Sequence, residues 1–207
     1  MRLLHEANYR ELKRVAGQLD AQDDESTLQV LALWSERGRL HAVLDEAARL
    51  LHNFLASAMT LVDHTRAHIN TWHAGTTFEK EYKRQVRESF TANPVSRFVQ
   101  CLRNYNLHYR LPVVSGRLSM EFDPPGQTKS MKSQVMLDVM KLQERDNWDP
   151  PSKTYMTRVG KELPVDRLAD DYMKLVLPFH DWFRERDLAE HYPHIRRAPR
   201  KTPSGGR

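Results

Sequence analysis

Arg103, Asn104 and His108 stand within one six-residue stretch, and their types are those required to cleave a phosphodiester. Arginine carries a permanent charge and a fork of N–H donors that fits a phosphate group. Histidine takes up and releases a proton near neutral pH, so it can serve as a general acid and base. The stretch therefore predicts cleavage of a phosphate ester that requires neither a metal ion nor a cofactor.

The element that positions this stretch is predicted to be a helix that begins at Asn93-Pro94 and ends before Pro112. Its apolar side chains share one face, and Arg103 and His108 lie on the other side. Five residues correspond to about 500° of rotation, so these two side chains point about 140° apart on a regular helix. They can act on one phosphate only if the helix loosens near its end or if a second copy of the chain completes the site.

Leu107 lies on the same side of that helix as Arg103 and His108. An exposed leucine beside polar residues is typical of a protein interface. A two-fold axis through this face would bring two arginines and two histidines into one cleft and would bury Leu107. The sequence therefore predicts a homodimer with Leu107 at its interface.

An arginine followed by a histidine after four to six intervening residues also occurs on a long predicted helix and near the basic end of the chain, at Arg66 with His73 and at Arg184 and Arg186 with His191. The stretch at Arg103 differs in its context, because Asn104 directly follows the arginine and long helices surround it. In these features residues 26–112 resemble the HEPN superfamily, helical domains of which many are RNA-cleaving toxins and defence nucleases.

This resemblance implies a metal-independent endoribonuclease whose products carry 2′,3′-cyclic phosphate ends. Arg103 would contact the scissile phosphate, and His108 would act as the general acid and base. Asn104 would orient one of these two residues, and Tyr109 is a supporting candidate. The implied partners are RNA, a second copy of the chain, and an antitoxin or another regulatory protein in a toxin–antitoxin or phage-defence setting.

The alternative function is a catalytically silent helical scaffold, or an RNA- or nucleotide-binding module, that acts with a partner protein. Four basic residues on the helix before the motif would then bind RNA: Lys80, Lys83, Arg84 and Arg87. The same helix also carries Glu79, Glu81 and Glu88. The basic residues form either a strip that follows a phosphate backbone or an ordinary solvated face.

Three histidines in the first half of the chain have a spacing that invites comparison with zinc sites. His64 and His68 are four residues apart on one helix face, and His73 follows. Zinc enzymes combine such histidines with a glutamate or cysteine at short spacing, which is missing near this segment. The sequence therefore predicts structural histidines and no metal site.

Composition and charge set the class of protein. The 207-residue chain carries 32 basic and 27 acidic residues, and its net charge of +5 permits a polyanionic partner without requiring one. Cys101 is the only cysteine, which excludes an intrachain disulfide. No apolar stretch is long enough to span a bilayer, and the first residues do not resemble a signal peptide. These features predict a cytoplasmic protein without a membrane partner.

Apolar residues recur at three- and four-residue intervals through most of the first half. This periodicity predicts helices over about 2–20, from 26 onward and, as the longest pattern, over 39–75. A further helix is expected over 165–187, with a kink at Pro178.

These elements predict a mainly all-α fold, a multi-helix up-and-down bundle in one domain over residues 1–193. Alternating apolar residues within 113–142 predict a small β-hairpin insertion after the motif helix, and a helix over 134–144 is the alternative. Residues 194–207 are basic and rich in proline and glycine, which predicts a flexible tail.

Overall fold

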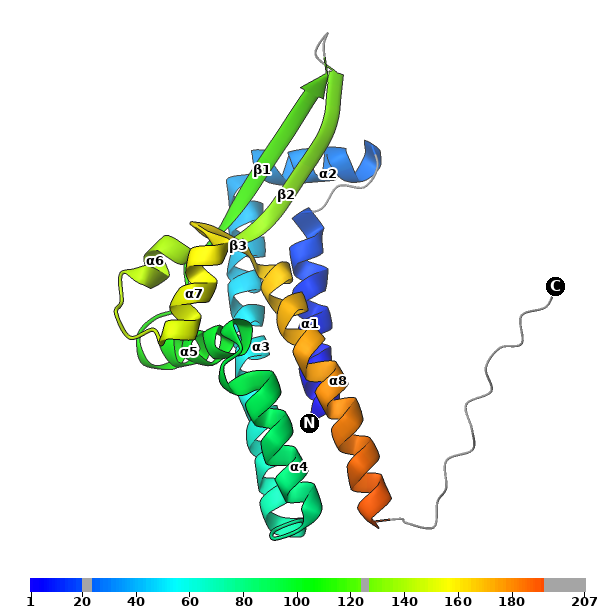
Figure 1. Cartoon of the computed structure of the whole chain (residues 1–207). Coiled ribbons are helices and arrows are strands. Elements are labelled where there is room, and N and C mark those ends of the chain that lie inside the picture. The colour runs from blue at the N-terminus through cyan, green and yellow to red at the C-terminus, as the bar shows by residue number, and fades with distance from the viewer. Residues whose placement is uncertain (20–23, 124–126, 192–207) are drawn as a thin grey trace, which may run out of the picture.

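The computed structural model of the chain describes residues 1–19, 24–123 and 127–191 (Figure 1). Eight α-helices and a three-stranded antiparallel sheet form the regular part of these residues, so the predicted mainly helical bundle with a small β insertion is confirmed. The predicted tail, 194–207, lies outside the described residues. No helix in the described ranges is both long and apolar enough to cross a membrane.

The elements follow one another as α1 (Arg2–Ala16), the 3₁₀ turn η1 (Gly17–Leu19), α2 (Asp24–Ser35), α3 (Arg37–Trp72), α4 (Thr77–Val86), the π-helical turn η2 (Arg87–Thr91), α5 (Pro94–His108), β1 (Val114–Asp123), β2 (Gln127–Asp138), α6 (Val139–Gln143), α7 (Pro150–Val159), β3 (Glu162–Pro164) and α8 (Val165–His191). The first helix, α1, packs against both α3 and α8. The β1–β2 hairpin projects from one end of the molecule, and α3 and α8 both end at the opposite end (Figure 1).

Helix α3 is the spine of the bundle, as its long apolar stripe predicts. It is 36 residues long and buries one face, which includes Leu51, Phe54, Ala58, Leu61 and Ile69. The chain then turns at Gly75, whose φ of 78° lies in the left-handed region that favours glycine. Thr76 caps the next helix by accepting a hydrogen bond from the backbone N–H of Glu79.

Helix α7 is an element that the periodicity does not predict. Asp149 caps it and accepts a hydrogen bond from the Ser152 N–H at 2.9 Å, and Pro150 occupies its first position. This is the same signal that starts α5 at Asn93-Pro94. Phe98 of α5 packs against Tyr155 of α7, with ring centroids 5.0 Å apart.

The hairpin insertion is confirmed, and the alternative helix over 134–144 is wrong for its first half. β2 continues to Asp138, where a side-chain cap starts the short helix α6. Helix α2 lies across this end of the bundle (Figure 1). There the Trp34 indole donates a hydrogen bond to the Ser133 hydroxyl and packs on Gly116, where a Cβ would come within 3.0 Å of its ring.

The final helix, α8, is longer than the predicted 165–187, because it continues to His191. Pro178 lies inside this helix, which continues on both sides of the proline. The added turn places His191 beside the end of α3, where its ring centroid lies 5.2 Å from that of His73.

Candidate functional site

The motif helix α5 is regular throughout the stretch that carries Arg103 and His108. The Asn93 side chain accepts hydrogen bonds from the N–H groups of Val95 and Ser96 at 3.0 and 3.2 Å. At the other end, the Tyr109 N–H still donates to the Tyr105 carbonyl at 3.0 Å. The helix therefore does not loosen before His108, so of the two predicted ways to join the pair only a second copy of the chain remains.

Arg103 and His108 consequently remain on different sides of α5, about 140° apart. One Arg103 nitrogen, Nη1, donates to the Asn104 side-chain oxygen at 3.2 Å. Its Nε is buried without a hydrogen-bond partner among the described residues. His108 is exposed. The described part of one chain thus does not bring the predicted arginine and histidine onto one phosphate.

The surface around the end of α5 is apolar and exposed. Leu107 is 45 % exposed, and the next exposed large hydrophobic residues along the chain are Tyr109, Leu111 and Val113. The Tyr109 ring lies under the guanidinium groups of Arg110 and Arg145, at 5.2 and 5.0 Å. Tyr109 therefore already makes cation–π contacts next to His108.

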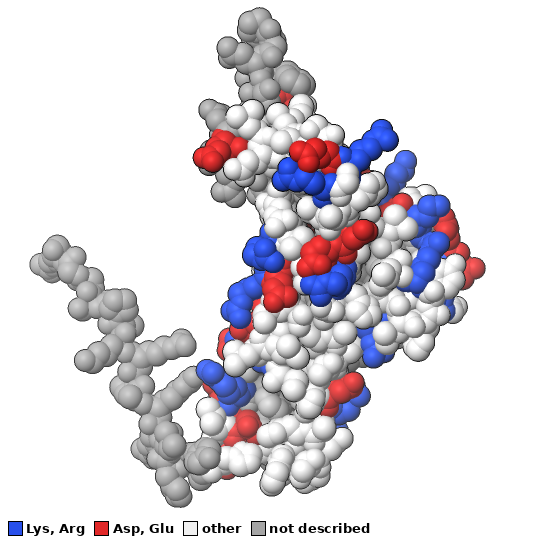
Figure 2. Space-filling model, turned by 180° about the vertical axis from the view of Figure 1, so that it is seen from behind, with Lys and Arg blue, Asp and Glu red and all other residues white. Residues whose placement is uncertain are grey.

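The predicted basic strip on α4 and η2 is exposed at all four positions, Lys80, Lys83, Arg84 and Arg87. Two of its three acidic neighbours form ion pairs: Glu79 pairs with Lys83 of the strip itself at 2.5 Å, and Glu81 pairs with Arg186 of α8 at 2.7 Å. On the face shown in Figure 2, basic and acidic side chains are interspersed with wide uncharged areas. This face therefore carries no broad basic surface among the described residues.

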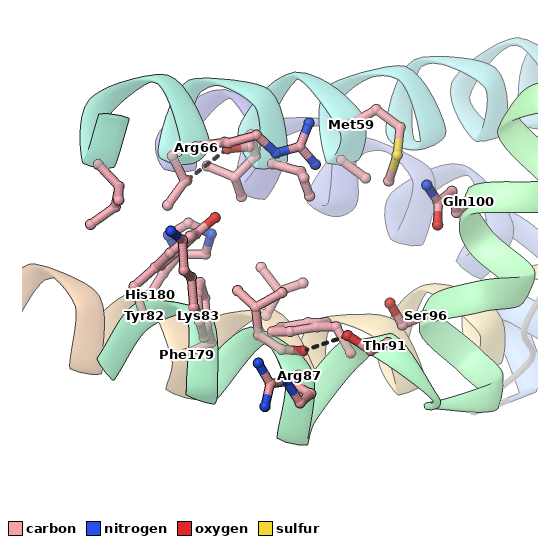
Figure 3. A pocket seen from close by; sticks show the side chains of 18 of the residues that line it. Met59, Arg66, Tyr82, Lys83, Arg87, Thr91, Ser96, Gln100, Phe179 and His180 are labelled. Carbon is pink, nitrogen blue, oxygen red and sulfur yellow. Dashed lines mark hydrogen bonds between the residues drawn. The ribbon is translucent and has the colours of Figure 1, made fainter. Parts of the chain in front are cut away.

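Two residues of this strip, Lys83 and Arg87, line a pocket of about 590 Å³ between α3, α4, η2, α5 and α8 (Figure 3). Arg66 projects from α3 on one side of the opening, and Lys83 and Arg87 come from the opposite side. Arg97 is the fourth basic residue of the lining, which contains no aspartate or glutamate among the described residues. The sequence analysis did not predict this pocket, because its lining comes from four separate segments.

The walls of the pocket are mostly apolar and aromatic. Its aromatic lining residues are Tyr82, Phe90, Tyr172 and Phe179, and Met59 and several aliphatic side chains complete the walls. Phe90 and Phe179 make an edge-to-face contact, with ring centroids 5.0 Å apart. Such a surface suits the flat face of a ring, while the basic side chains above it suit an anion.

The π-helical turn η2 explains how Phe90 reaches the pocket. Phe78, Tyr82, Val86 and Phe90 recur every four residues. On a regular helix each interval of four residues turns about 40° beyond a full turn, so three intervals place Phe90 about 120° around the helix from Phe78. The wider π-turn over Arg87–Thr91 reduces this drift. π-Turns occur often at functional sites, and the strict four-residue spacing is the sequence signal that could have revealed this one.

Polar groups stand at both ends of the pocket. Ser96 and Gln100 of α5 lie at one end and His180 at the other (Figure 3). Burial, with a further contribution from Arg2, lowers the pKa of His180 to about 4, so this histidine is neutral at pH 7. Arg97 is held by Asp149 at 2.6 Å. Arg66, Lys83 and Arg87 are exposed, whereas Arg97 is only partly exposed, so these three residues provide the accessible positive charge of the pocket.

A second cluster joins residues that are remote in the sequence. The Nε2 atoms of His68 and His73 each lie 2.8 Å from one carboxylate oxygen of Asp187, Oδ1. The donor atoms of these three residues all lie within 4.8 Å of one another, so they have the separations of a metal-binding group. The sequence analysis considered the histidines without Asp187, because the carboxylate arrives from the last turn of α8. His64, the other predicted neighbour, is exposed and is not part of this group.

Comparison of the chain with protein-family models, with curated proteins and with solved structures found no match. The resemblance of residues 26–112 to the HEPN superfamily therefore stays a prediction. The function is inferred below from the chemistry and the positions of the side chains themselves.

Proposed function

We propose that the chain is an RNA-binding module that takes one nucleotide of a single-stranded segment into the pocket between α3, α4, α5 and α8. The observation that carries this proposal is the lining of the pocket, which combines four basic side chains with aromatic walls and contains no carboxylate in the described ranges. The volume of about 590 Å³ lies within the range of about 300–1,000 Å³ that is typical of ligand pockets.

In this arrangement the phosphate binds at the opening of the pocket, between Arg66 on α3 and the residues Lys83 and Arg87 on the opposite side (Figure 3). Arg66 also pairs with Asp63 at 3.3 Å and Lys83 with Glu79 at 2.5 Å. Both of those pairs are exposed, so a phosphate can replace the carboxylates at little cost. The side chain of Arg87 makes no hydrogen bond or ion pair within the described residues.

The base then stacks on the aromatic wall formed by Tyr82, Phe90 and Phe179. Stacking on an aromatic side chain stabilises a bound base by about 1–3 kcal/mol and tolerates any base. Lys80 and Arg84 lie on the exposed side of α4. They are placed to contact the phosphates of the nucleotides that stay outside the pocket.

The test is fluorescence anisotropy of a labelled single-stranded RNA oligonucleotide at several salt concentrations. The double variant Arg66→Ala/Arg87→Ala should weaken binding and should flatten the plot of log affinity against log salt by roughly 0.7 for each phosphate that the protein no longer neutralises. His108→Ala is the matched control, because His108 is also exposed but lies outside the pocket. Equal affinity of the wild type and the double variant at every salt concentration would contradict the proposal.

A second candidate function, a HEPN-type endoribonuclease, is favoured by the apolar surface beside the motif. The exposure of Leu107, Tyr109, Leu111 and Val113 fits an interface that a second copy of the chain would cover. Two chains related by a two-fold axis would then supply an arginine and a histidine from different sides. An antitoxin or another regulatory protein covering the same surface would restrain the activity.

In that enzyme His108 removes the proton of a 2′-hydroxyl, and the 2′-oxygen attacks the adjacent phosphorus. The bond from phosphorus to the 5′-oxygen breaks, and His108 of the partner subunit protonates the leaving oxygen. Arg103 stabilises the charge on the phosphoryl oxygens. Proton transfer of this kind accelerates a reaction by about 10²–10⁴. RNA incubated with the protein in EDTA should then be cleaved by the wild type and not by His108→Ala or Arg103→Ala.

A further inference from the structure

The ends of α3 and α8 bring imidazole and carboxylate donors to a common point. His68 lies in the last turns of α3, His73 directly follows that helix, and Asp187 lies in the last turns of α8. The Asp187 Oδ1 atom is 2.8 Å from Nε2 of both histidines. The Nδ1 of His191 lies 3.4 Å from the same oxygen. Nitrogen atoms from three imidazole rings thus surround a single carboxylate oxygen.

We propose that His68, His73 and Asp187 bind a Zn²⁺ ion, which joins the ends of α3 and α8. Zinc takes nitrogen and oxygen ligands of this kind, most often two or three histidines with a carboxylate or water. Calcium and magnesium prefer sites made of oxygen atoms, so a set with two imidazoles selects against them.

The separations of the donor atoms fit this ion after a small movement. A tetrahedral zinc ion with bonds of about 2.0–2.1 Å holds its ligand atoms roughly 3.3 Å apart. Here the histidine nitrogens are 2.8 Å from the carboxylate oxygen, and the three donor atoms lie within 4.8 Å of one another. For zinc to replace the two hydrogen bonds, each nitrogen must therefore move roughly half an ångström away from the carboxylate oxygen. Donor atoms that are as far as 4.8 Å apart must also approach one another, by at most roughly 1.5 Å.

The two rings pack against aromatic neighbours, and packing of this kind fixes the orientation of the side chains in a binding site. His73 is 4 % exposed and makes an edge contact with Phe78, with ring centroids 4.8 Å apart. His68 makes a similar contact with Phe183 at 5.8 Å. The positions of both imidazoles are thus determined by packing in addition to the hydrogen bonds to Asp187.

The ionisation of Asp187 suits a cation. Burial alone would raise the pKa of this carboxyl, but the hydrogen bonds from His68 and His73 outweigh it and lower the pKa. The nearest arginine in the sequence does not compete for this charge, because Arg186 pairs with Glu81 at 2.7 Å and with Glu190 at 3.0 Å. Asp187 is consequently an ionised ligand at neutral pH.

The cluster is also accessible from solvent. A hollow of about 500 Å³ is lined by His64, His68 and Asp187 together with apolar side chains. A hydrated ion can reach the two donors that face this hollow, while His73 completes the site from the buried side. His191, on the last turn of α8, is the nearest further imidazole.

Bound zinc would hold the two helices that form opposite walls of the RNA pocket. Arg66 of α3 lies two residues before His68, and Phe179 of α8 lies two turns before Asp187. The ring of Tyr82 lies 6.0 Å from Phe179 and 6.1 Å from Phe183, which contacts His68. Packed aromatic rings therefore lie between the metal site and the pocket.

The experiment uses the full chain without a histidine tag, freed of metal by EDTA and then dialysed. Zn²⁺ is titrated in competition with a fluorescent zinc chelator, which gives both stoichiometry and affinity. The wild type should bind one ion per chain, and Asp187→Asn and His68→Gln should each weaken binding at least tenfold. The asparagine keeps an oxygen that can accept the two hydrogen bonds but removes the charge, so it separates a ligand from a hydrogen-bond acceptor.

His41→Gln is the matched control, because His41 is an exposed histidine near the other end of α3. It should bind zinc as the wild type does. Free zinc at a hundredfold excess over Kd should also raise the melting temperature of the wild type by roughly 5–10 °C and should not raise that of Asp187→Asn. Circular dichroism before each titration verifies that both variants are folded.

The proposal is overturned if the wild type binds no zinc at micromolar concentration. It is equally overturned if Asp187→Asn and His68→Gln bind with wild-type affinity, because the cluster would then be a hydrogen-bond network alone. RNA binding that persists without zinc leaves the proposed function intact, so the two proposals can fail separately.

Discussion

The end of α5 and the meeting point of α3 and α8 hold their histidines in different ways. His108 and Arg103 are close in the sequence, yet they lie on different sides of a regular helix. His68 and Asp187 are 119 residues apart, yet their side chains are 2.8 Å apart. The first pair can form a shared site only with another molecule, whereas the second forms one within the chain. In this protein the residues that are close in sequence, Arg103 and His108, do not form a site within one chain. His68 and Asp187, which are remote in sequence, come together in one.

The two regions also differ in what surrounds the polar atoms. At the α3–α8 end, rings of Phe78 and Phe183 pack against the histidines. At the α5 end, Leu107 and the apolar residues that follow it are exposed. Rigid packing suits the binding of a small ion, while an exposed apolar surface suits contact with another protein.

The largest expected difference between the two regions is in stability, when one histidine of each region is replaced by alanine in two separate variants. His73→Ala should lower the free energy of unfolding by about 2–4 kcal/mol, because it removes a buried ring and a hydrogen bond to a carboxylate. His108→Ala should behave as a surface substitution with little effect, because His108 is exposed. The measurement is urea denaturation of both variants in the presence of a chelator. Equal destabilisation of the two variants would show that the regions do not differ in this respect.

A smaller effect on stability is expected from His5. This histidine is buried, unlike His108, and its hydrogen-bond partner is a hydroxyl group, not a carboxylate as for His68 and His73. Its Nδ1 donates to the Ser57 hydroxyl, which itself donates to the Phe54 carbonyl. Burial, with a smaller contribution from His180, lowers the pKa of His5 to about 4. Between pH 6.5 and pH 4 the unfolded chain takes up a proton at this residue and the folded chain does not. The free energy of unfolding therefore decreases as the pH is lowered from 6.5 to 4, by at most about 3 kcal/mol.

The variant His5→Gln isolates this contribution from that of His180, whose pKa is also lowered. Its free energy of unfolding should change less between pH 7 and pH 4.5 than that of the wild type. An unchanged pH dependence in His5→Gln would mean that acid destabilisation arises at other groups.

Local signals in the sequence predict most of the helices. Asn93-Pro94 and Thr76 are caps whose hydrogen bonds are made by neighbouring residues, so the positions where α4 and α5 begin follow from the sequence alone. Asp149-Pro150 is the same kind of signal, but the periodicity does not predict helix α7, because its apolar pattern extends over only 10 residues, compared with 36 in α3. Helix α7 could therefore have been predicted from its capping signal.

The candidate sites could not be predicted in the same way. The pocket depends on how far α8 lies from α4, and the cluster depends on the last turn of α8 reaching the end of α3. No local rule sets these distances, because they result from the packing of side chains along the whole bundle. The sequence did predict the exposure of Leu107 correctly, since the side of a helix on which a residue lies is a local property.

The smallest expected effect on folding, and a decisive one for the α5 end, is that of Leu107→Glu. Leu107 is 45 % exposed, so the substitution should change the free energy of unfolding by less than about 0.5 kcal/mol. If a second copy covers this surface, a buried carboxylate would disrupt the dimer, and light scattering should report a monomer. Leu188→Glu is the matched control, because Leu188 is 50 % exposed on α8, remote from α5. A dimer that tolerates Leu107→Glu would place the interface elsewhere, and a monomeric wild type that cleaves RNA would exclude a site shared between two chains.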